Sequence, residues 1–451
     1  MGDFDLIIRG GTVVTPAGPV AADLGVAGGQ VRVLGPDVSG AGQEVVDAAG
    51  LHIFPGVIDA HVHFNEPGRT HWEGFETGSH AVAAGGGTVF FDMPLNAHPP
   101  TIDAESFQLK LAAAQKHSVV DFAFWGGLVP QNLDRLAELA ECGVIGFKAF
   151  MADSGIDDFP CVNDRVLREG MKRAAQLRLP VAVHAESETM IRQLTQERLA
   201  QGRTSIRDYL ASRPIAAEVD AIGRALDLAG ETGCALHVVH VSCGEGVQLI
   251  AEAQRRGADV SCETCSHYLS LTAADVEKLG AIAKCAPPLR SAKEQERLWQ
   301  HLIAGELTTV GSDHSPSPPE MKENANFFEV WGGISGAQHV LPILLTEAHS
   351  KRGVPLALIS GLLSGNVAKR FNLPETKGRI AVGADADFAL VSLSRTLDVQ
   401  EEALFYRHPE TPYLGRRLRG RIVRTILRGR TVFNDCDIVA QPPGRLIRPV
   451  K

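Results

Sequence analysis

Long apolar runs are missing from this sequence, and so is an N-terminal targeting segment. A transmembrane helix needs about 20 consecutive apolar residues, and no stretch of the chain approaches that length. Residues 1–5 are acidic and lack the basic start and the apolar core of a signal peptide. We therefore expect a soluble, cytoplasmic protein with no membrane partner.

Cysteine and positive charge are also in short supply. The 8 cysteines among 451 residues are an ordinary number for a cytoplasmic protein and do not indicate a disulfide framework. The chain has 44 Lys and Arg against 53 Asp and Glu, which gives a net charge of −9. Because no overall positive field attracts phosphates, nucleic acid is not expected as a partner.

The size and composition are those of a globular protein with a large core. A chain of 451 residues corresponds to roughly three domains, or to one large barrel with a satellite domain. Hydrophobic residues make up 44% of the chain and charged residues 22%, which is close to the globular average. The chain is therefore expected to fold around an extensive apolar interior.

Both ends of the chain contain short predicted strands separated by glycines. Residues 5–9, 31–34 and 44–47 have this character near the N-terminus, and residues 387–391 and 423–433 near the C-terminus. Neither end has many strands, and chain termini often lie close together. We therefore predict one small β-sandwich domain that is built from both termini.

Between the termini, short apolar runs alternate with longer segments of helical composition. Eight such runs predict a (β/α)₈ barrel over residues 54–375, flanked by sandwich parts at 1–53 and 376–451. A doubly wound open sheet is the alternative, but no Gly-x-Gly-x-x-Gly follows a first strand to support it. The runs cover residues 53–60, 88–92, 119–125, 144–150, 180–184, 235–241, 258–262 and 308–311.

Histidine, lysine and aspartate stand in or at the ends of these runs, where a (β/α)₈ barrel carries its reactive residues. His61 and His63 are two residues apart, so that both imidazoles point the same way from an extended chain. A single histidine at a strand end is more often a hydrogen-bonded core residue, but four with an aspartate are hard to explain independently. Neutral imidazoles and carboxylates suit Zn²⁺ and similar ions. The candidate ligands are His61, His63, Lys148, His184, His240 and Asp313.

Lys148 is the most informative of these positions, because it interrupts an otherwise apolar run. If its side chain faces the barrel interior, an unpaired ammonium there is costly and loses its proton readily. The neutral amine can then add CO₂ to form a carbamate, which is an anionic ligand able to bridge two metals. The alternative is a lysine that extends to solvent. The neighbouring histidines and aspartate favour the carbamate.

Cys262 and Cys265 have a spacing that is found in redox and zinc sites. No second Cys-x-x-Cys pair occurs in the chain. We therefore expect this pair to have a structural role at the end of the seventh run.

Two segments resemble the cyclic amidohydrolases, the group of dihydroorotases, hydantoinases (dihydropyrimidinases) and allantoinases. They are residues 55–63, PGVIDAHVH, and residues 312–316, SDHSP, and the resemblance extends over essentially the whole chain. It implies that His61, His63 and Asp313 bind the more buried of two divalent metal ions. It also implies that a second ion is bound by His184 and His240, and that Lys148, as N6-carboxylysine, bridges the two.

Within this group the chain most resembles the allantoinase branch. Dihydroorotases carry an arginine where this chain has Asn65, and hydantoinases carry a tyrosine that supports the oxyanion where it has Asp153. The second difference leaves open what stabilises the oxyanion here. The stretches that are similar to allantoinases are residues 66–74, 93–96, 209–214, 284–290, 313–322, 331–334, 406–408 and 412–415.

The resemblance implies hydrolysis of the hydantoin ring of allantoin to allantoate, a step of purine and ureide degradation. Asp313 would act as the catalytic residue that moves the proton. A dihydropyrimidinase or hydantoinase is the alternative, and a non-catalytic oligomeric scaffold is an alternative of another class, although scaffold relatives lack metal ligands that are all present here. The candidate substrate contacts are Asn96, Ala286, Ser315 and Gly332.

The resemblance also implies partners and cofactors. We expect two divalent ions per subunit, Zn²⁺ first and Fe²⁺, Co²⁺ or Mn²⁺ as alternatives, together with CO₂ for the lysine carbamate. The resemblance implies a homotetramer. Nothing in the sequence alone specifies the number of subunits.

Overall fold

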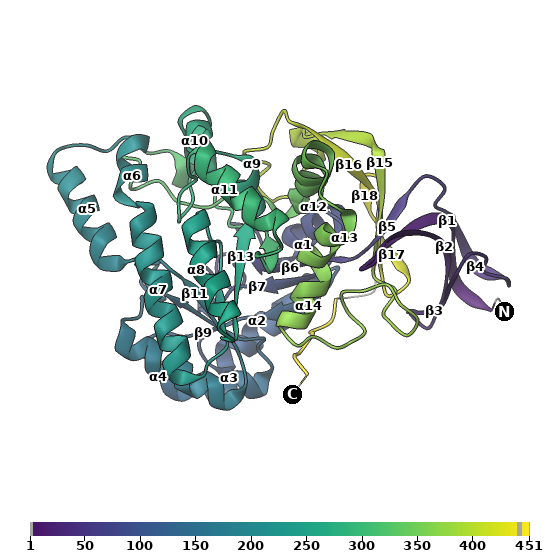
Figure 1. Ribbon diagram of the computed structural model, residues 1–451, viewed down its shortest axis with the longest axis horizontal. Coiled ribbons are helices and arrows are strands. Elements are labelled where there is room, and N and C mark those ends of the chain that lie inside the picture. Colours follow the sequence, from purple (N-terminus) through teal and green to yellow (C-terminus); the bar gives the residue numbers. More distant parts are fainter. Residues whose placement is uncertain (1–2, 440–443, 451) are drawn as a thin grey trace.

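The computed structural model describes residues 3–439 and 444–450, and it contains a barrel and a separate terminal sheet (Figure 1). Strands from both ends of the chain pair in one sheet of nine strands, in the order β18-β17-β16-β15-β5-β1-β2-β3, with β4 on β1. These strands are β1 (Phe4–Thr15), β2 (Gly18–Ala27), β3 (Gln30–Gly35), β4 (Gly42–Asp47), β5 (His52–Pro55), β15 (Phe388–Asp398), β16 (Arg417–Leu427), β17 (Arg430–Asn434) and β18 (Asp437–Ile438).

The terminal sheet has its own apolar core. Alternation in its strands sends residues such as Leu24 from the first part and Phe388 and Ile426 from the last part to the same interior. Ile53 of β5 lies in this core as well, and β5 pairs with β1 on one side and with β15 on the other. Strand β5 therefore joins the two ends of the chain.

The barrel is built from parallel strands that are buried on both faces, as expected for strands covered by helices. Two stretches, β6-β7-β8 and β9 to β14, are hydrogen-bonded sheets. Only Trp125 separates β8 from β9, and a parallel bridge from Val62 to His314 brings the first strand beside the end of the last. The strands are β6 (Val57–Val62), β7 (Gly87–Asp92), β8 (Asp121–Phe124), β9 (Gly126–Gly127), β10 (Phe147–Phe150), β11 (Val181–His184), β12 (Leu236–Val238), β13 (Val260–Cys265) and β14 (Thr309–Gly311).

Helices follow most barrel strands and cover the outside of the barrel (Figure 1). The short helices α12, α13 and α14 are linked by π-helical turns at Leu345–Ser350 and Gly361–Gly365. The helices are α1 (Phe75–Ala84), α2 (Ala104–His117), α3 (Leu136–Cys142), α4 (Asp164–Leu177), α5 (Glu188–Ala200), α6 (Ile206–Ser212), α7 (Ile215–Thr232), α8 (Gly244–Arg255), α9 (Ser266–Ser270), α10 (Ala273–Leu279), α11 (Ala292–Ile303), α12 (Val340–Leu344), α13 (Leu356–Ser360) and α14 (Asn366–Arg370).

The predicted fold class, a (β/α)₈ barrel plus a small β-sandwich domain formed by both chain termini, is confirmed, with corrections in detail. The strands of the terminal domain pair in one separate sheet. The first predicted run, 53–60, contains the end of β5 and the start of β6, which belong to different sheets. Gly56 separates the two strands, and a side chain at this position would collide with Thr88. The predicted strand 423–433 is a hairpin of β16 and β17, because Gly429 turns the chain with a φ of 73°.

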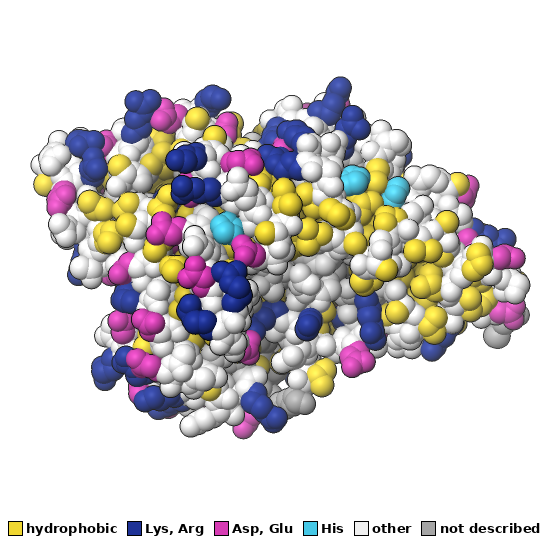
Figure 2. Space-filling view, in the orientation of Figure 1, with side chains coloured by type: hydrophobic (Ala, Val, Ile, Leu, Met, Phe, Trp, Pro, Cys, Tyr) yellow, Lys and Arg dark blue, Asp and Glu magenta, His cyan; other side chains and the backbone are white. Residues whose placement is uncertain are grey.

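The domain limits predicted from the sequence, after residues 53 and 375, stay a prediction, and the first lies inside β5. Among the described residues, none of the helices combines the length and the apolar character needed to cross a membrane. On the face drawn in Figure 2, basic and acidic side chains are interspersed over both parts of the molecule.

Candidate metal centre

A cleft of about 510 Å³ opens at the carboxyl ends of the barrel strands, where (β/α)₈ enzymes carry their active sites. Lys148 does not line it but lies behind it, in β10, with no exposed surface. The other predicted ligands and all four predicted substrate contacts line the cleft: His61, His63, Asn96, His184, His240, Ala286, Asp313, Ser315 and Gly332.

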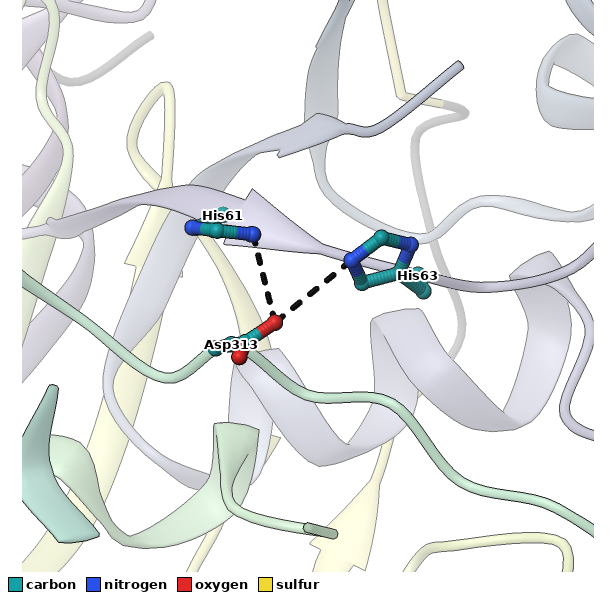
Figure 3. A group of neighbouring side chains, drawn as sticks. All are labelled: His61, His63 and Asp313. Atoms are coloured by element: carbon teal, nitrogen blue, oxygen red, sulfur yellow. Dashed lines mark ion pairs between the residues drawn. The ribbon is translucent and has the colours of Figure 1, made fainter. Parts of the chain in front are cut away.

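His61, His63 and Asp313 form the first group of potential ligands (Figure 3). His61 lies near the end of β6, His63 follows that strand, and Asp313 follows β14. Oδ1 of Asp313 is 3.2 Å from Nε2 of His61 and 3.5 Å from Nε2 of His63. Three ligand atoms that converge in this way could hold one divalent ion.

His184 and His240 form the second group. His184 is the last residue of β11, and its Nδ1 lies 3.0 Å from Nε2 of His240. His240 is not on a strand, because β12 ends at Val238, and its backbone has a φ of 42°. The rings of His61 and His240 are 5.4 Å apart, so that the two groups are adjacent.

Lys148 places a buried amine behind the cleft. Its Nζ has no hydrogen-bond partner among the described residues and lies 5.0 Å from the centre of the Phe150 ring. Burial lowers the pKa of Lys148 to about 7, although Asp313 and Glu263 favour its charged form. A large fraction of this amine is therefore neutral at neutral pH, which is the form that can react with CO₂.

Two buried carboxylates orient the histidines, and the sequence reasoning missed both. Oε1 of Glu263 is 2.8 Å from Nδ1 of His61, and Oε2 of Glu186 is 2.8 Å from Nε2 of His184. If each carboxylate accepts the ring N–H, then Nε2 of His61 and Nδ1 of His184 are left as metal ligands. Glu186 is also paired with Arg213.

Signals for these carboxylates existed in the sequence. Glu186 follows His184 by two residues, and Glu263 is enclosed in the pair Cys262 and Cys265. The role of that segment is thus not limited to structure, because Glu263 contacts a predicted ligand 202 residues away.

Burial controls the charges of this centre. It lowers the pKa of His61, His184 and His240, and the nearby Lys148 cation lowers each further. Burial also raises the pKa of Asp313, but His61 and His63 oppose this effect and hold the pKa below its usual range. Neutral imidazoles beside an ionised carboxylate are the donor set that divalent metals of the zinc type require.

Strained backbone marks the rim of the cleft. Asn96, His240 and Asp313, which line the cleft, all have positive φ, which costs about 1–3 kcal/mol each and is concentrated at functional sites in proteins. The amide Nδ2 of Asn96 lies 3.4 Å from Nδ1 of His63 and 3.5 Å from Oγ of Ser315. The predicted contacts Asn96 and Ser315 are therefore neighbours beside the first group of ligands.

Asp153 lies at the mouth of the cleft. Its Oδ1 accepts a hydrogen bond from the amide of Gly155 at 3.1 Å, and its own amide donates to Glu188 at 2.8 Å. The carboxylate is thus bonded within its own loop. As an acceptor it does not replace the phenol donor that hydantoinases carry at this position.

Comparisons with known proteins agree on one family. The model of the amidohydrolase family matches residues 52–432. The chain is 56% identical to an allantoinase of Rubrobacter xylanophilus over 449 residues, covering 100% of this chain and 98% of that one. It is 52% identical to an allantoinase of Deinococcus radiodurans, covering 99% of both.

Solved structures of hydantoinases have the same fold. The L-hydantoinase of Arthrobacter aurescens superposes with a TM-score of 0.96 at 35% identity, covering 99% of this chain and 100% of that one. The dihydropyrimidinase of Brevibacillus agri superposes with a TM-score of 0.92 at 31% identity, covering 100% and 99%.

Proposed function

Because the chain belongs to the amidohydrolase family, a family of metal-dependent hydrolases, we propose that it hydrolyses the hydantoin ring of allantoin to give allantoate. The observation that carries this proposal is the cleft itself, where both groups of ligands meet in a chain that is similar to allantoinases from end to end.

We propose that the six residues hold two divalent metal ions. His61, His63 and Asp313 would bind one, His184 and His240 the other, and Lys148 would bridge them as N6-carboxylysine. The buried Nζ of Lys148, which has no hydrogen-bond partner among the described residues, supports this assignment. The oxygens of a carbamate would have the metal ions as partners, whereas the bare amine has none. Zn²⁺ is the metal proposed first, and Fe²⁺, Co²⁺ or Mn²⁺ suit the same donors.

The chain's own residues would carry the proton and hold the substrate. When bound, a pair of divalent ions polarises a carbonyl and makes water a stronger acid. Asp313, held ionised by His61 and His63, would accept the proton of the attacking water and deliver it to the departing ring nitrogen. The amide of Asn96, the hydroxyl of Ser315 and the main chain at Ala286 and Gly332 would orient the ring.

An activity panel tests the substrate. One preparation, with its metal content measured, is offered allantoin, dihydroorotate, hydantoin and dihydrouracil. We expect ring opening of allantoin. Activity on hydantoin or dihydrouracil with none on allantoin would establish the second candidate, a hydantoinase, which is favoured by the similarity to the Arthrobacter aurescens structure. Absence of both bound metal and hydrolysis after reconstitution would instead support the scaffold alternative.

We also propose that the enzyme is a cytoplasmic homotetramer. The subunit number comes from the resemblance to the cyclic amidohydrolases, and light scattering of the purified protein tests it.

A further inference from the structure

A second group of side chains that could hold a metal ion shares Asp313 with the first group. The sulfur of Cys265, a ring nitrogen of His267 and a carboxylate oxygen of Asp313 all lie within 4.8 Å of one another. Cys265 ends β13, His267 lies in α9, and Asp313 follows the neighbouring strand β14. Parallel pairing places Cys265 opposite Gly311, two residues before Asp313, so that the fold itself brings the three side chains together.

The imidazole of His267 is buried, and its ring nitrogens have no hydrogen-bond partner of normal geometry among the described residues. The carbonyl of Ser312 and the carboxylate of Asp313 are both close to the ring. A buried imidazole without a good partner is costly, and a ligand on its lone pair removes part of that cost.

The cluster differs in chemistry from the proposed catalytic centre. The six proposed catalytic ligands contain no sulfur, whereas this group combines a thiol, an imidazole and a carboxylate. Thiolate and imidazole ligands select thiophilic ions such as Cd²⁺, Hg²⁺ and Zn²⁺ over harder ions. Asp313 belongs to both groups, lines the cleft, and its side chain is 13% exposed, so that an ion can enter past it.

We propose that Cys265, His267 and Asp313 form a separate site for one thiophilic divalent ion, and that occupation of this site inhibits the enzyme. Binding replaces the S–H bond of Cys265 by a sulfur–metal bond and releases one proton to solvent. Asp313 is drawn to the new ion and is no longer available to move the proton of the reaction. The inhibition rests on the role proposed for Asp313, but the binding does not.

Cadmium binding to the metal-loaded enzyme tests the site without any substrate. The parent should bind one Cd²⁺ per subunit more than Cys265→Ser does, by equilibrium dialysis. It should also show an ultraviolet Cd²⁺–thiolate band, which no sulfur-free centre produces. His267→Gln, on a different element, should likewise lose the extra ion and the band. Either variant decides the question if its circular dichroism shows that it is folded.

Cys285→Ser is the matched control. Cys285 is also buried beside the cleft, but its sulfur donates to the carbonyl of Pro287 and stands outside the cluster. This variant should keep the extra Cd²⁺ and the band. The concentration of Cd²⁺ that halves the activity should rise more than about tenfold in Cys265→Ser. Loss of a residue that only hydrogen-bonds to a metal ligand already lowers metal affinity by about tenfold, and Cys265 would be a direct ligand. A parent without the band, a band that survives in both cluster variants, or a band lost in Cys285→Ser would overturn the proposal.

Discussion

At the scale of single residues, the properties of this site arise from burial. An ammonium, several imidazoles and several carboxylates are removed from water together, and each is then shifted toward the charge that its neighbours allow. The pKa values of Lys148, His61, His184 and His240 are shifted toward the neutral forms, whereas Asp313 stays ionised. These are the protonation states that metal ligands need.

Replacement of Lys148 tests the proposed carbamate. Lys148→Ala should lose bound metal and more than about 100-fold in activity, because it would remove the ligand proposed to be shared by both ions, and loss of a direct ligand costs more affinity than loss of a residue that only contacts a ligand. Short acids such as acetate or propionate should restore part of both by occupying the gap. Metal analysis and activity with and without propionate measure this.

Lys110 provides the control for Lys148. It is also fully buried, but its Nζ is bonded to Asp92 and to the carbonyl of Met93. Lys110→Ala should destabilise the fold, and propionate should not rescue it. A Lys148→Ala enzyme that keeps its metals and most of its rate would contradict the carbamate.

Glu263 should contribute to metal affinity through His61. Glu263→Gln removes the carboxyl group that lies 2.8 Å from Nδ1 of the His61 imidazole, and we expect metal affinity to fall about 10–100-fold. Competition with a chelator measures the change. Glu277→Gln, which removes a surface carboxylate paired with Arg207, should have no effect on it. Equal affinities in both variants would show that Glu263 has no positioning role.

His339 should make stability depend on pH. Burial, assisted by His314, lowers the pKa of His339 from its ordinary 6.5 to about 3. Between these values the unfolded chain binds a proton that the folded chain does not, so that the free energy of unfolding falls as the pH falls below about 6.5. The slope is about 1.4 kcal/mol per pH unit.

His339→Asn keeps an acceptor for the hydroxyl of Tyr406 but cannot titrate. Urea denaturation of the parent and of this variant between pH 6.5 and pH 5 measures the difference in slope. Parallel curves for the two proteins would show that His339 is not responsible.

At the scale of elements, the cleft depends on how one loop is fastened over it. Residues 328–333 line the cleft, and the ammonium of Lys284 donates to the main-chain carbonyls of Phe327, Phe328 and Val330. The amide of Gly333 donates in return to the carbonyl of Lys284 at 2.8 Å. Lys284 thus holds the first part of this segment, and Lys322 adds bonds to the carbonyls of Trp331 at 3.4 Å and Gly333 at 2.9 Å.

Lys284→Met should loosen this loop. A hydrogen bond contributes about 1 kcal/mol to stability and several are lost together, so amide exchange in residues 324–333 should accelerate at least about tenfold. The Michaelis constant for allantoin should rise more than the turnover number falls, because the loop lines the cleft but carries no metal ligand. Exchange measured by mass spectrometry gives the first result, with Lys278→Met on the exposed surface as the control. Unchanged exchange would show that other contacts hold the loop.

At the scale of the whole molecule, a buried ion cluster connects the barrel to the terminal sheet. The ammonium of Lys377 lies 2.8 Å from Asp121, the first residue of β8, and 2.7 Å from Asp387, beside β15. Asp385 is 3.0 Å away, and Arg428 of the terminal sheet also pairs with Asp121. The two domains therefore share charges that are hidden from water.

Lys377→Met should destabilise both domains together. Removal of one partner leaves uncompensated buried carboxylates, which costs about 3–5 kcal/mol. Thermal or urea denaturation followed by fluorescence should show an earlier transition. Lys351→Met provides the control, because Lys351 is exposed and its pair with Glu347 should contribute at most about 1 kcal/mol. A shift no larger than that of the control would show that the cluster is not needed.

Local properties of the chain were enough to predict the class of fold and the ligand candidates. The continuous apolar character of each run reflects burial on both faces of a parallel strand, and it is visible in any single run. Because the carboxyl ends of all barrel strands meet at one rim, residues of five separate runs could be expected to converge. The structure does bring His61, His184, His240 and Asp313 to one cleft, although His240 stands beyond its strand.

Only the tertiary structure decided which groups touch. Composition cannot show that the run 53–60 is divided between two sheets, because both parts are equally apolar. Nor can spacing reveal that Glu263 meets His61 from 202 residues away, or that Cys265 and His267 lie beside Asp313. Such contacts depend on strand register and on the direction of each side chain, which are determined when the whole barrel closes and not by any one segment.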